Sequence, residues 1–229
     1  MSRRERAHRS VFDDPQVVAG YRAWRGLSPI EERAISSVLT PESHVLEVGV
    51  GTGRVAEEIA PRCASYTGVE CSILMLREAS AAAACDRLIG GDILEIDPGM
   101  ARFDIVLCMH NVVDEFHPRR RREALFERLH SWLMPTGCVI YSSHLPFARR
   151  PRATQLAQRL RDRLIHTRGW AYVPERYHGH TVWQYRSKPE AEQELMTAWG
   201  FIIDHTWEDD SRWPPDWAYY RAHRSLRSH

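Results

Sequence analysis

The chain has 229 residues, of which 43% are hydrophobic and 27% charged, and its formal net charge at pH 7 is +1. This length and composition are ordinary for a soluble protein with one α/β domain. No apolar run reaches the roughly 20 residues that cross a bilayer, and a net charge near zero argues against a surface tuned as a whole for nucleic acid. We therefore predict a single domain, with neither a membrane nor a nucleic acid as its partner.

The N-terminus, MSRRERAHRS, is basic, but no long apolar stretch with a cleavage site follows it, so it does not resemble a secretion signal. The five cysteines are odd in number, and none lies in a close pair such as C-x-x-C. This pattern is typical of reduced thiols and predicts a cytoplasmic protein. Nothing in the sequence indicates the oligomeric state.

The N-terminal part of the chain carries apolar residues at helical spacing between residues 15 and 39, which predicts two helices. From residue 45 onward, short apolar runs alternate with helical patterns. Strands are predicted at 45–50, 66–70, 87–92, 103–109 and 138–144, and helices at 54–60, 73–84 and 119–133. This alternation predicts a parallel sheet covered on both faces. Arginines 119–122 form the densest basic cluster, which we assign to the solvated face of an amphipathic helix.

The segment after the predicted strand at 138–144 is long for a connection in a compact domain, which indicates an insertion with its own structure. It predicts a helix at 153–165 and a hairpin formed by GWAYV and HTVWQYR. A helix at 189–199, ended by Gly200, and strands at 201–207 and 217–223 follow, with a turn-rich stretch at 208–216 between the strands. The single domain, residues 1–229, is thus divided into an N-terminal helical cap (1–40), a cofactor-binding core (41–144), a substrate-lid insertion (145–187) and a C-terminal helix with an antiparallel strand pair (188–229).

The segment VLEVGVGTG places Gly49, Gly51 and Gly53 in a turn between a buried strand and a helix. Glycine permits a tight turn and close approach of a ligand to the backbone, and the N-terminus of a helix presents free N–H groups. This arrangement predicts a cofactor site.

The spacing of these glycines disfavours a nicotinamide dinucleotide. A G-x-G-x-x-G fingerprint would place its third glycine at position 54, where this chain has Arg54. The carboxylate of Glu47 is also hard to explain beside a pyrophosphate, but it suits a cationic ligand such as an ammonium or a sulfonium. The spacing and the charge together favour a positively charged cofactor.

With an acidic residue followed by G-x-G-x-G, the sequence resembles the class I S-adenosylmethionine-dependent methyltransferases, and the resemblance extends over most of the chain. It implies a Rossmann-like, three-layer α/β sandwich whose seven-stranded sheet is parallel except for the antiparallel last strand. It also implies S-adenosyl-L-methionine as cofactor and S-adenosyl-L-homocysteine as product.

The resemblance implies a role for each residue of the cofactor site. Glu70, at the end of YTGVE, would bind both ribose hydroxyls, with Cys71 or Ser72 beside the adenine. Asp92 would face the adenine amino group and Ile93 would pack on the ring. The residues implied at the cofactor are Tyr21, Glu47, Gly49, Gly51, Gly53, Arg54, Glu70, Cys71, Asp92, Ile93, Met109 and His110. Tyr21, with Trp24, would form an aromatic lid, although aromatic residues at this spacing are also typical of a core.

A sulfonium is already an activated methyl donor, so the protein mainly aligns the nucleophile and excludes water. A general base helps where the nucleophile arrives protonated. The candidate bases are Asp114, Glu115, His144, His178 and His180. His144 ranks first, because ligands of open α/β sheets bind outside the carboxyl ends of the strands. Asp114 and Glu115 could equally cap the next helix.

The segment YHGHTVWQY mixes aromatic and imidazole side chains, which suits stacking on a flat substrate, but the same pattern fits an ordinary amphipathic hairpin. His178 and His180, at positions i and i+2, would lie on one side of a strand without an evident third ligand, so we predict no metal site.

The leading hypothesis is a methyltransferase that acts on a nitrogen or oxygen of a small molecule, possible in secondary metabolism, with the N-terminal helices and the insertion enclosing the substrate. An RNA or protein methyltransferase and a noncatalytic cofactor-binding protein are the alternatives.

Overall fold

The computed structural model describes residues 11–82, 85–98, 103–146, 163, 165, 167–208 and 217–225, and two short helices lead into its sheet. Helix α2 (Pro15–Ala23) begins after Asp14, whose side chain accepts a hydrogen bond from the backbone of Gln16. Helix α3 (Pro29–Ser36) begins with a reciprocal capping box between Ser28 and Glu31. A proline in the first turn and a polar cap before it are the usual start of a helix, so both elements follow from local sequence.

The sheet contains five parallel strands in the order β3-β2-β1-β4-β5, followed by an antiparallel strand. These strands are β1 (His44–Val48), β2 (Ser65–Glu70), β3 (Arg87–Gly90), β4 (Phe103–Cys108) and β5 (Leu133–His144). Strand β9 (Trp217–Arg224) lies antiparallel between β5 and β8 (Phe201–Glu208). The predicted seven-stranded Rossmann-like sheet with an antiparallel last strand is therefore confirmed.

The sheet also includes two strands that the family pattern did not predict as part of it. Strands β6 (Trp170–Tyr177) and β7 (His180–Ser187) form the predicted hairpin. The hairpin joins the sheet because β7 pairs with the end of β5 at His144 and Arg186. The helix predicted at 153–165 lies almost wholly outside the described residues, as does the turn-rich stretch at 208–216.

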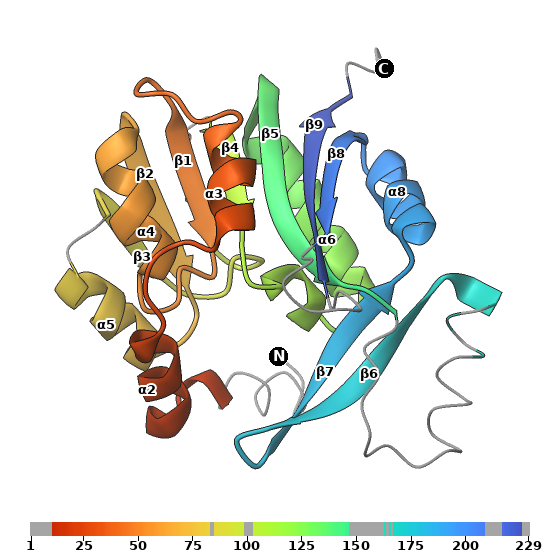
Figure 1. Cartoon of the computed structure of the whole chain (residues 1–229), viewed down its shortest axis with the longest axis horizontal. Helices are drawn as coiled ribbons and strands as arrows, with labels where there is room; N and C mark the ends of the chain where they lie inside the picture. The colour runs from red at the N-terminus through yellow and green to blue at the C-terminus, as the bar shows by residue number, and fades with distance from the viewer. Residues whose placement is uncertain are drawn as a thin grey trace.

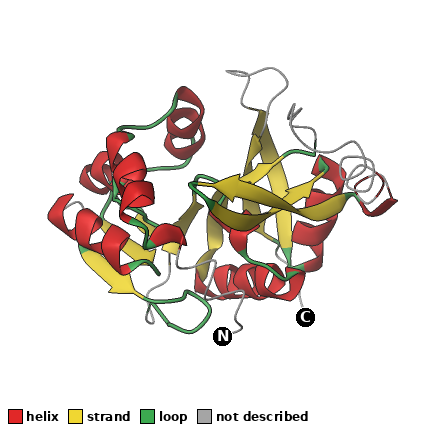
Figure 2. Ribbon diagram, turned by 90° about the horizontal axis from the view of Figure 1, so that it is seen from below, coloured by secondary structure: helices red, strands yellow, loops and turns green. Residues whose placement is uncertain are grey.

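Helices cover both faces of the sheet, as Figures 1 and 2 show. Residues of α3, α4 (Arg54–Ile59) and α5 (Ile73–Ala82) pack with Val45 of β1 in one core cluster, and residues of α6 (Arg119–Trp132) and α8 (Pro189–Ala198) pack with Leu46 in the other. Short 3-10 helices follow α4 (η1, Ala60–Arg62) and β4 (η2, Val112–Glu115). Consecutive strand residues point to opposite faces, which is why neighbours in β1 belong to different cores.

Helix α2 and the β6–β7 hairpin extend to the same side of the sheet, beyond the carboxyl ends of its parallel strands (Figure 1). They meet in a small apolar cluster in which Val182 of β7 packs with Val17 and Val18 of α2. His180 and Asp14 add a polar contact, with 3.0 Å between Nε2 and Oδ2. Two segments far apart in the sequence therefore enclose this end of the sheet.

The arginine cluster at 119–122 does not form the solvated face that its charge predicts. Arg122 has no exposed surface, and Arg121 reaches Asp92, with 2.6 Å between Nη2 and Oδ2. Successive helical residues are turned by about 100°, so four consecutive arginines cannot share one face. Within the described part of the chain, no helix is long and apolar enough to cross a membrane.

Candidate functional site at the carboxyl edge of the sheet

Two cavities lie at the carboxyl edge, with volumes of about 450 Å³ and about 40 Å³. Both are lined by Tyr21, Gly49, Gly51, Met109 and His110. The larger cavity extends from these residues past the ends of β2 and β3, and the smaller one extends toward Glu47 and Arg54. A volume of this size is in the range of sites for cofactors and other small molecules.

The glycine turn positions the backbone against both cavities. Gly49 and Gly51 have φ angles of 75° and 58°, in the left-handed region that L side chains rarely adopt. The turn is fixed to β2, because the N–H groups of Gly49 and Val50 donate to the carbonyl of Val69 at 2.8 and 3.0 Å. A Cβ on Gly51 would meet only Met75 Sδ and Gly49 O, at 3.9 and 4.0 Å, so the space beyond it is open.

Gly53, the third glycine of the motif, lies in a different environment. Gly53 lines neither cavity among the described residues, and a Cβ there would lie 3.3 Å from the Cα of Ala79 in α5. Its φ angle of 91° also requires glycine. Gly53 lets α4 start close to α5, and its predicted contact with the cofactor stays a prediction.

Glu70 and Asp92 mark the ends of β2 and β3 in the wall of the larger cavity, beside Cys71 and Ile93. The Glu70 carboxylate accepts hydrogen bonds from the N–H groups of Gly51 and Ser72, at 2.9 and 2.7 Å. Burial raises the pKa of Glu70, although these backbone donors oppose the shift. Glu70 therefore places a carboxyl group, held by backbone donors, in the wall of the cavity.

The sequence left open whether Cys71 or Ser72 lies beside the ligand. Cys71 lines the larger cavity, whereas Ser72 is buried and its Oγ donates to the Phe12 carbonyl at 2.7 Å. Ser72 therefore holds the segment that precedes α2, and Cys71 is the residue in contact with the cavity.

Glu47 and Arg54 line the smaller cavity but make quite different contacts. Glu47 is 2% exposed and accepts a hydrogen bond from the Tyr66 hydroxyl at 2.6 Å. Burial raises the pKa of Glu47 to about 8. Arg54 donates to both carboxylate oxygens of Glu31, at 2.7 and 2.8 Å, and lies over the Trp24 ring. Arg54 is therefore already neutralised by a residue that the sequence analysis did not connect with the site.

His110 lies where the two cavities meet. Its ring packs edge-on against Tyr21, Trp24 and Trp217, with centroid distances of 5.5, 4.6 and 5.5 Å. Its Nδ1 is buried without a hydrogen-bond partner in the structure. Burial, aided by the charge of Arg54, lowers the pKa of His110 to about 4, so its imidazole is neutral at pH 7. A buried polar atom without a partner at a cavity wall fits a role in ligand binding.

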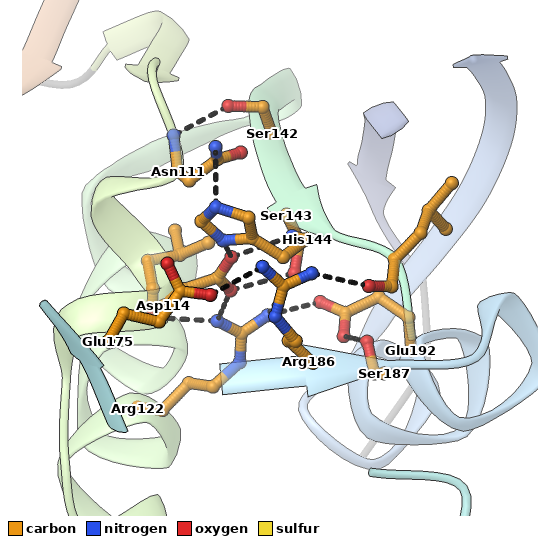
Figure 3. A network of polar contacts seen from close by, with 12 residues as sticks. Asn111, Asp114, Arg122, Ser142, Ser143, His144, Glu175, Arg186, Ser187 and Glu192 are labelled. Carbon is orange, nitrogen blue, oxygen red and sulfur yellow. Dashed lines mark hydrogen bonds and ion pairs between the residues drawn. The ribbon is translucent and has the colours of Figure 1, made fainter. Parts of the chain in front are cut away.

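His144 and Asp114 form a hydrogen-bonded pair behind this wall (Figure 3). The Nδ1 of His144 lies 2.8 Å from Asp114 Oδ2, and its Nε2 lies 3.4 Å from the amide nitrogen of Asn111. Since a carboxylate only accepts, the proton belongs on Nδ1 and the lone pair on Nε2. Neither residue is in the wall of the two cavities.

Asp114 has no exposed surface and is surrounded by donors. It accepts hydrogen bonds from Arg122, the Ser143 hydroxyl and the backbone N–H of His144, each at 2.7 Å. Asp114 does not cap α6, whose N-cap is Pro118, and its burial among these donors gives no support to its predicted role as a base. Asp114 instead orients His144.

The spacing of His178 and His180 predicts that both lie on one side of a strand, but the structure does not place them so. His178 is exposed in the turn between β6 and β7, with a φ angle of 43°, and His180 begins β7. His178 lines neither cavity among the described residues, so its predicted catalytic role finds no support in its position. Trp183 of the same hairpin does line the larger cavity.

Several residues that line the larger cavity belong to no motif that the sequence predicts as part of the site. They are Phe12, Met75, Val112, Phe116, His117, Pro118, Arg120 and Arg121. The loop after β4 could have been proposed as a whole, because loops at the carboxyl ends of strands form the sites of α/β folds. The individual side chains depend on how η2 and α6 pack.

Comparison with known proteins identifies the central part of the chain. Residues 45–137, which include the glycine turn and the ends of β1 to β4, match the family of methyltransferase domains. The comparison with curated proteins found no match.

Solved structures share the fold over nearly the whole length. A structure described as a DhpI complex with S-adenosylhomocysteine has a TM-score of 0.67 at 18% identity, with 97% of each chain covered. The CcbJ methyltransferase from Streptomyces caelestis has a TM-score of 0.66 at 18% identity, covering 94% of this chain and 98% of its own. The glycopeptide N-methyltransferase MtfA, described with S-adenosylmethionine, has a TM-score of 0.61 at 17% identity, covering 85% and 92%. At these identities the likeness is one of fold.

Proposed function

We propose that this chain, a class I S-adenosylmethionine-dependent methyltransferase, transfers the methyl group to a nitrogen or oxygen of a small molecule. The observation that carries the proposal is the partly enclosed cavity at the carboxyl edge, which is lined by the glycine turn, Glu70 and Asp92 and lies on the side of the sheet where α2 and the hairpin meet. A compact acceptor suits such an enclosure better than a folded RNA or protein surface.

The residues present fit S-adenosylmethionine. Glu70 would accept from the ribose hydroxyls, and Asp92, beside Cys71 and Ile93, would accept from the adenine amino group. Gly51 leaves space for the ligand against the backbone, and Glu47 would face the cationic end. His110, whose Nδ1 has no hydrogen-bond partner among the described residues, lines both cavities together with Tyr21 and Met109.

When bound, S-adenosylmethionine would supply a methyl group activated by the sulfonium, with the neutral sulfur of S-adenosylhomocysteine as the leaving group. The protein aligns the acceptor and excludes water. We propose that His144 takes the proton that the acceptor loses, at Nε2, once the acceptor displaces the amide of Asn111. Asp114 holds the Nδ1 proton and so keeps the Nε2 lone pair available.

Calorimetric titration with S-adenosylmethionine, S-adenosylhomocysteine and NADH tests the cofactor site. We expect both adenosyl ligands to bind and NADH not to bind. Glu70→Gln should weaken the binding of S-adenosylhomocysteine roughly tenfold or more, since hydrogen bonds to a charged group are lost. Glu95→Gln, an exposed carboxylate outside the cavity, is the matched control. Binding of NADH alone, or equal affinities in both variants, would contradict the assignment.

Methyl transfer to a panel of amines, phenols and carboxylic acids then tests the reaction itself. With an acceptor from this panel, His144→Gln should lower kcat about 100-fold or more while the affinity for S-adenosylhomocysteine stays the same. An unchanged kcat would leave His144 with a structural role only. A protein that binds the cofactor but methylates neither small molecules nor macromolecules would be noncatalytic.

A further inference from the structure

The larger cavity has a part that the proposed cofactor contacts leave unused. Phe116, His117, Pro118, Arg120 and Trp183 line the cavity but belong to none of the segments assigned to ribose, adenine or methionine. They come from the start of α6, the loop before it, and β7 of the hairpin. We call this set the 116–120/Trp183 subsite. It adjoins the proposed cofactor region, because both line the same cavity and Arg121, next to Arg120, is paired with Asp92.

The subsite has an aromatic wall that is built before any ligand binds. The rings of His117 and Trp183 are stacked, with a centroid distance of 5.7 Å and an interplanar angle of 26°. Tyr172 of β6 packs edge-on against His117 at 4.6 Å, and its hydroxyl donates to the carbonyl of Phe116 at 2.8 Å. A rigid wall of flat rings favours a flat apolar ligand.

The charge at the subsite comes from Arg120. Its neighbours are engaged elsewhere: Arg119 donates to Glu123 at 2.9 Å, Arg121 is paired with Asp92, and Arg122 is buried. For Arg120, the described part of the chain offers no ion-pair partner. Of the two acidic residues nearest in sequence, Glu123 is paired with Arg119, and Glu115 has an interaction of its own. A guanidinium without a partner at a cavity wall favours an anionic group.

We propose that the 116–120/Trp183 subsite binds the methyl acceptor, and that this acceptor is an aromatic acid. Its flat ring packs against the His117–Trp183 wall, and its acidic group lies beside Arg120. The inference rests on the proposed function, because it assigns the rest of the cavity to S-adenosylmethionine.

Two probes with the same ring and opposite charges test the inference: indole-3-acetate and tryptamine. Each is titrated into the protein saturated with S-adenosylhomocysteine and followed by calorimetry and saturation-transfer NMR. We expect indole-3-acetate to bind at least roughly tenfold more tightly than tryptamine, with an affinity that falls as salt rises. Equal binding of both probes, tighter binding of tryptamine, or binding of neither would overturn the inference.

Variants locate the binding of the acid within the cavity. Arg120→Gln should weaken indole-3-acetate roughly tenfold, whereas Arg119→Gln, one position away and already paired with Glu123, should change it less than about twofold. Trp183→Leu should weaken both probes. All three variants should bind S-adenosylhomocysteine as the parent protein does, which shows that they fold.

These measurements distinguish a failure of the proposed function from a failure of the subsite assignment. If the parent protein fails to bind S-adenosylhomocysteine, the proposed function fails. If it binds S-adenosylhomocysteine and the Arg120 and Arg119 variants have the same affinity for indole-3-acetate, only the assignment of the subsite fails.

Discussion

Glu47 lies beneath the glycine turn with its carboxyl group almost completely buried. Burial raises its pKa to about 8, and the hydrogen bond from the Tyr66 hydroxyl and the charge of Arg54 oppose the rise without cancelling it. In the free protein at pH 7, Glu47 is therefore mostly protonated and uncharged. A ligand with an ammonium or sulfonium group favours the ionised form, so binding and deprotonation are linked.

We predict that S-adenosylmethionine binding at pH 7 releases a proton from Glu47. Because the carboxylate is the form that attracts the cation, the affinity should rise as the pH increases from 6 to 8 and level off above the folded pKa. Titration at pH 7 in buffers of different ionisation enthalpy measures the released protons. Glu47→Gln should abolish both the release and the pH dependence. A parent protein that releases no protons would contradict the linkage.

Arg122 connects several elements behind the site. It extends from α6 and donates to Asp114 of η2 at 2.7 Å and to Glu192 of α8 at 2.5 Å, while the hydroxyl of Ser187 in β7 donates to Glu192 at 2.9 Å (Figure 3). Although burial lowers the pKa of a guanidinium, the carboxylates of Glu192 and Asp114 raise that of Arg122. The loop that orients His144 is thus held by a buried ion pair as well as by the packing of Val113 in the core.

We predict that Arg122→Met lowers the free energy of unfolding by about 3–5 kcal/mol, because two buried carboxylates lose their shared partner. Arg119→Ala, which breaks an exposed pair with Glu123 in the same helix, should cost less than about 1 kcal/mol. Urea unfolding followed by circular dichroism measures both values. A cost for Arg122→Met as small as that of the control would mean that the network contributes little to stability.

The enclosure of the cavity is a property of the whole molecule. Helix α2 comes from the N-terminal part of the chain and the hairpin from residues 170–187, yet both pack on Met75 of α5 through one apolar cluster. The cluster is small, and the contact between Asp14 and His180 that accompanies it is partly exposed. A contact of this kind opens locally at a lower free energy than the main core.

We predict that S-adenosylhomocysteine slows amide hydrogen exchange in α2 and at the tip of the hairpin, because a ligand that binds only the closed form stabilises it. Amides in β8, which pairs only with β9 at the far edge of the sheet from β1, should exchange at the same rate with and without ligand. Hydrogen–deuterium exchange with mass spectrometry measures both regions. Equal exchange in α2 in the two states would show that this helix does not close on the ligand.

Much of the fold could be predicted from the sequence because its signals are local. The capping residues before α2 and α3, the alternating strand and helix patterns, and Gly200 after α8 each act within a few residues of their own position. The glycine turn was equally predictable, since its φ angles and its place between β1 and α4 depend only on adjacent residues. For these reasons the sequence alone determined the fold class, and it predicts a cofactor site at the glycine turn.

Only the tertiary structure decided which side chains face the cavity and which face each other. Arg122 lies at helical spacing with Leu125, Phe126 and Leu129 on the buried face of α6. Its charge predicts exposure, and only its contacts with Asp114 of η2 and Glu192 of α8 explain why it is buried. Asp114 is hydrogen-bonded to His144, Gly53 lies close to Ala79 of α5, and Arg54 is paired with Glu31. Each of these contacts joins residues that are distant in the sequence. Such pairings depend on how elements pack, and no local pattern records them.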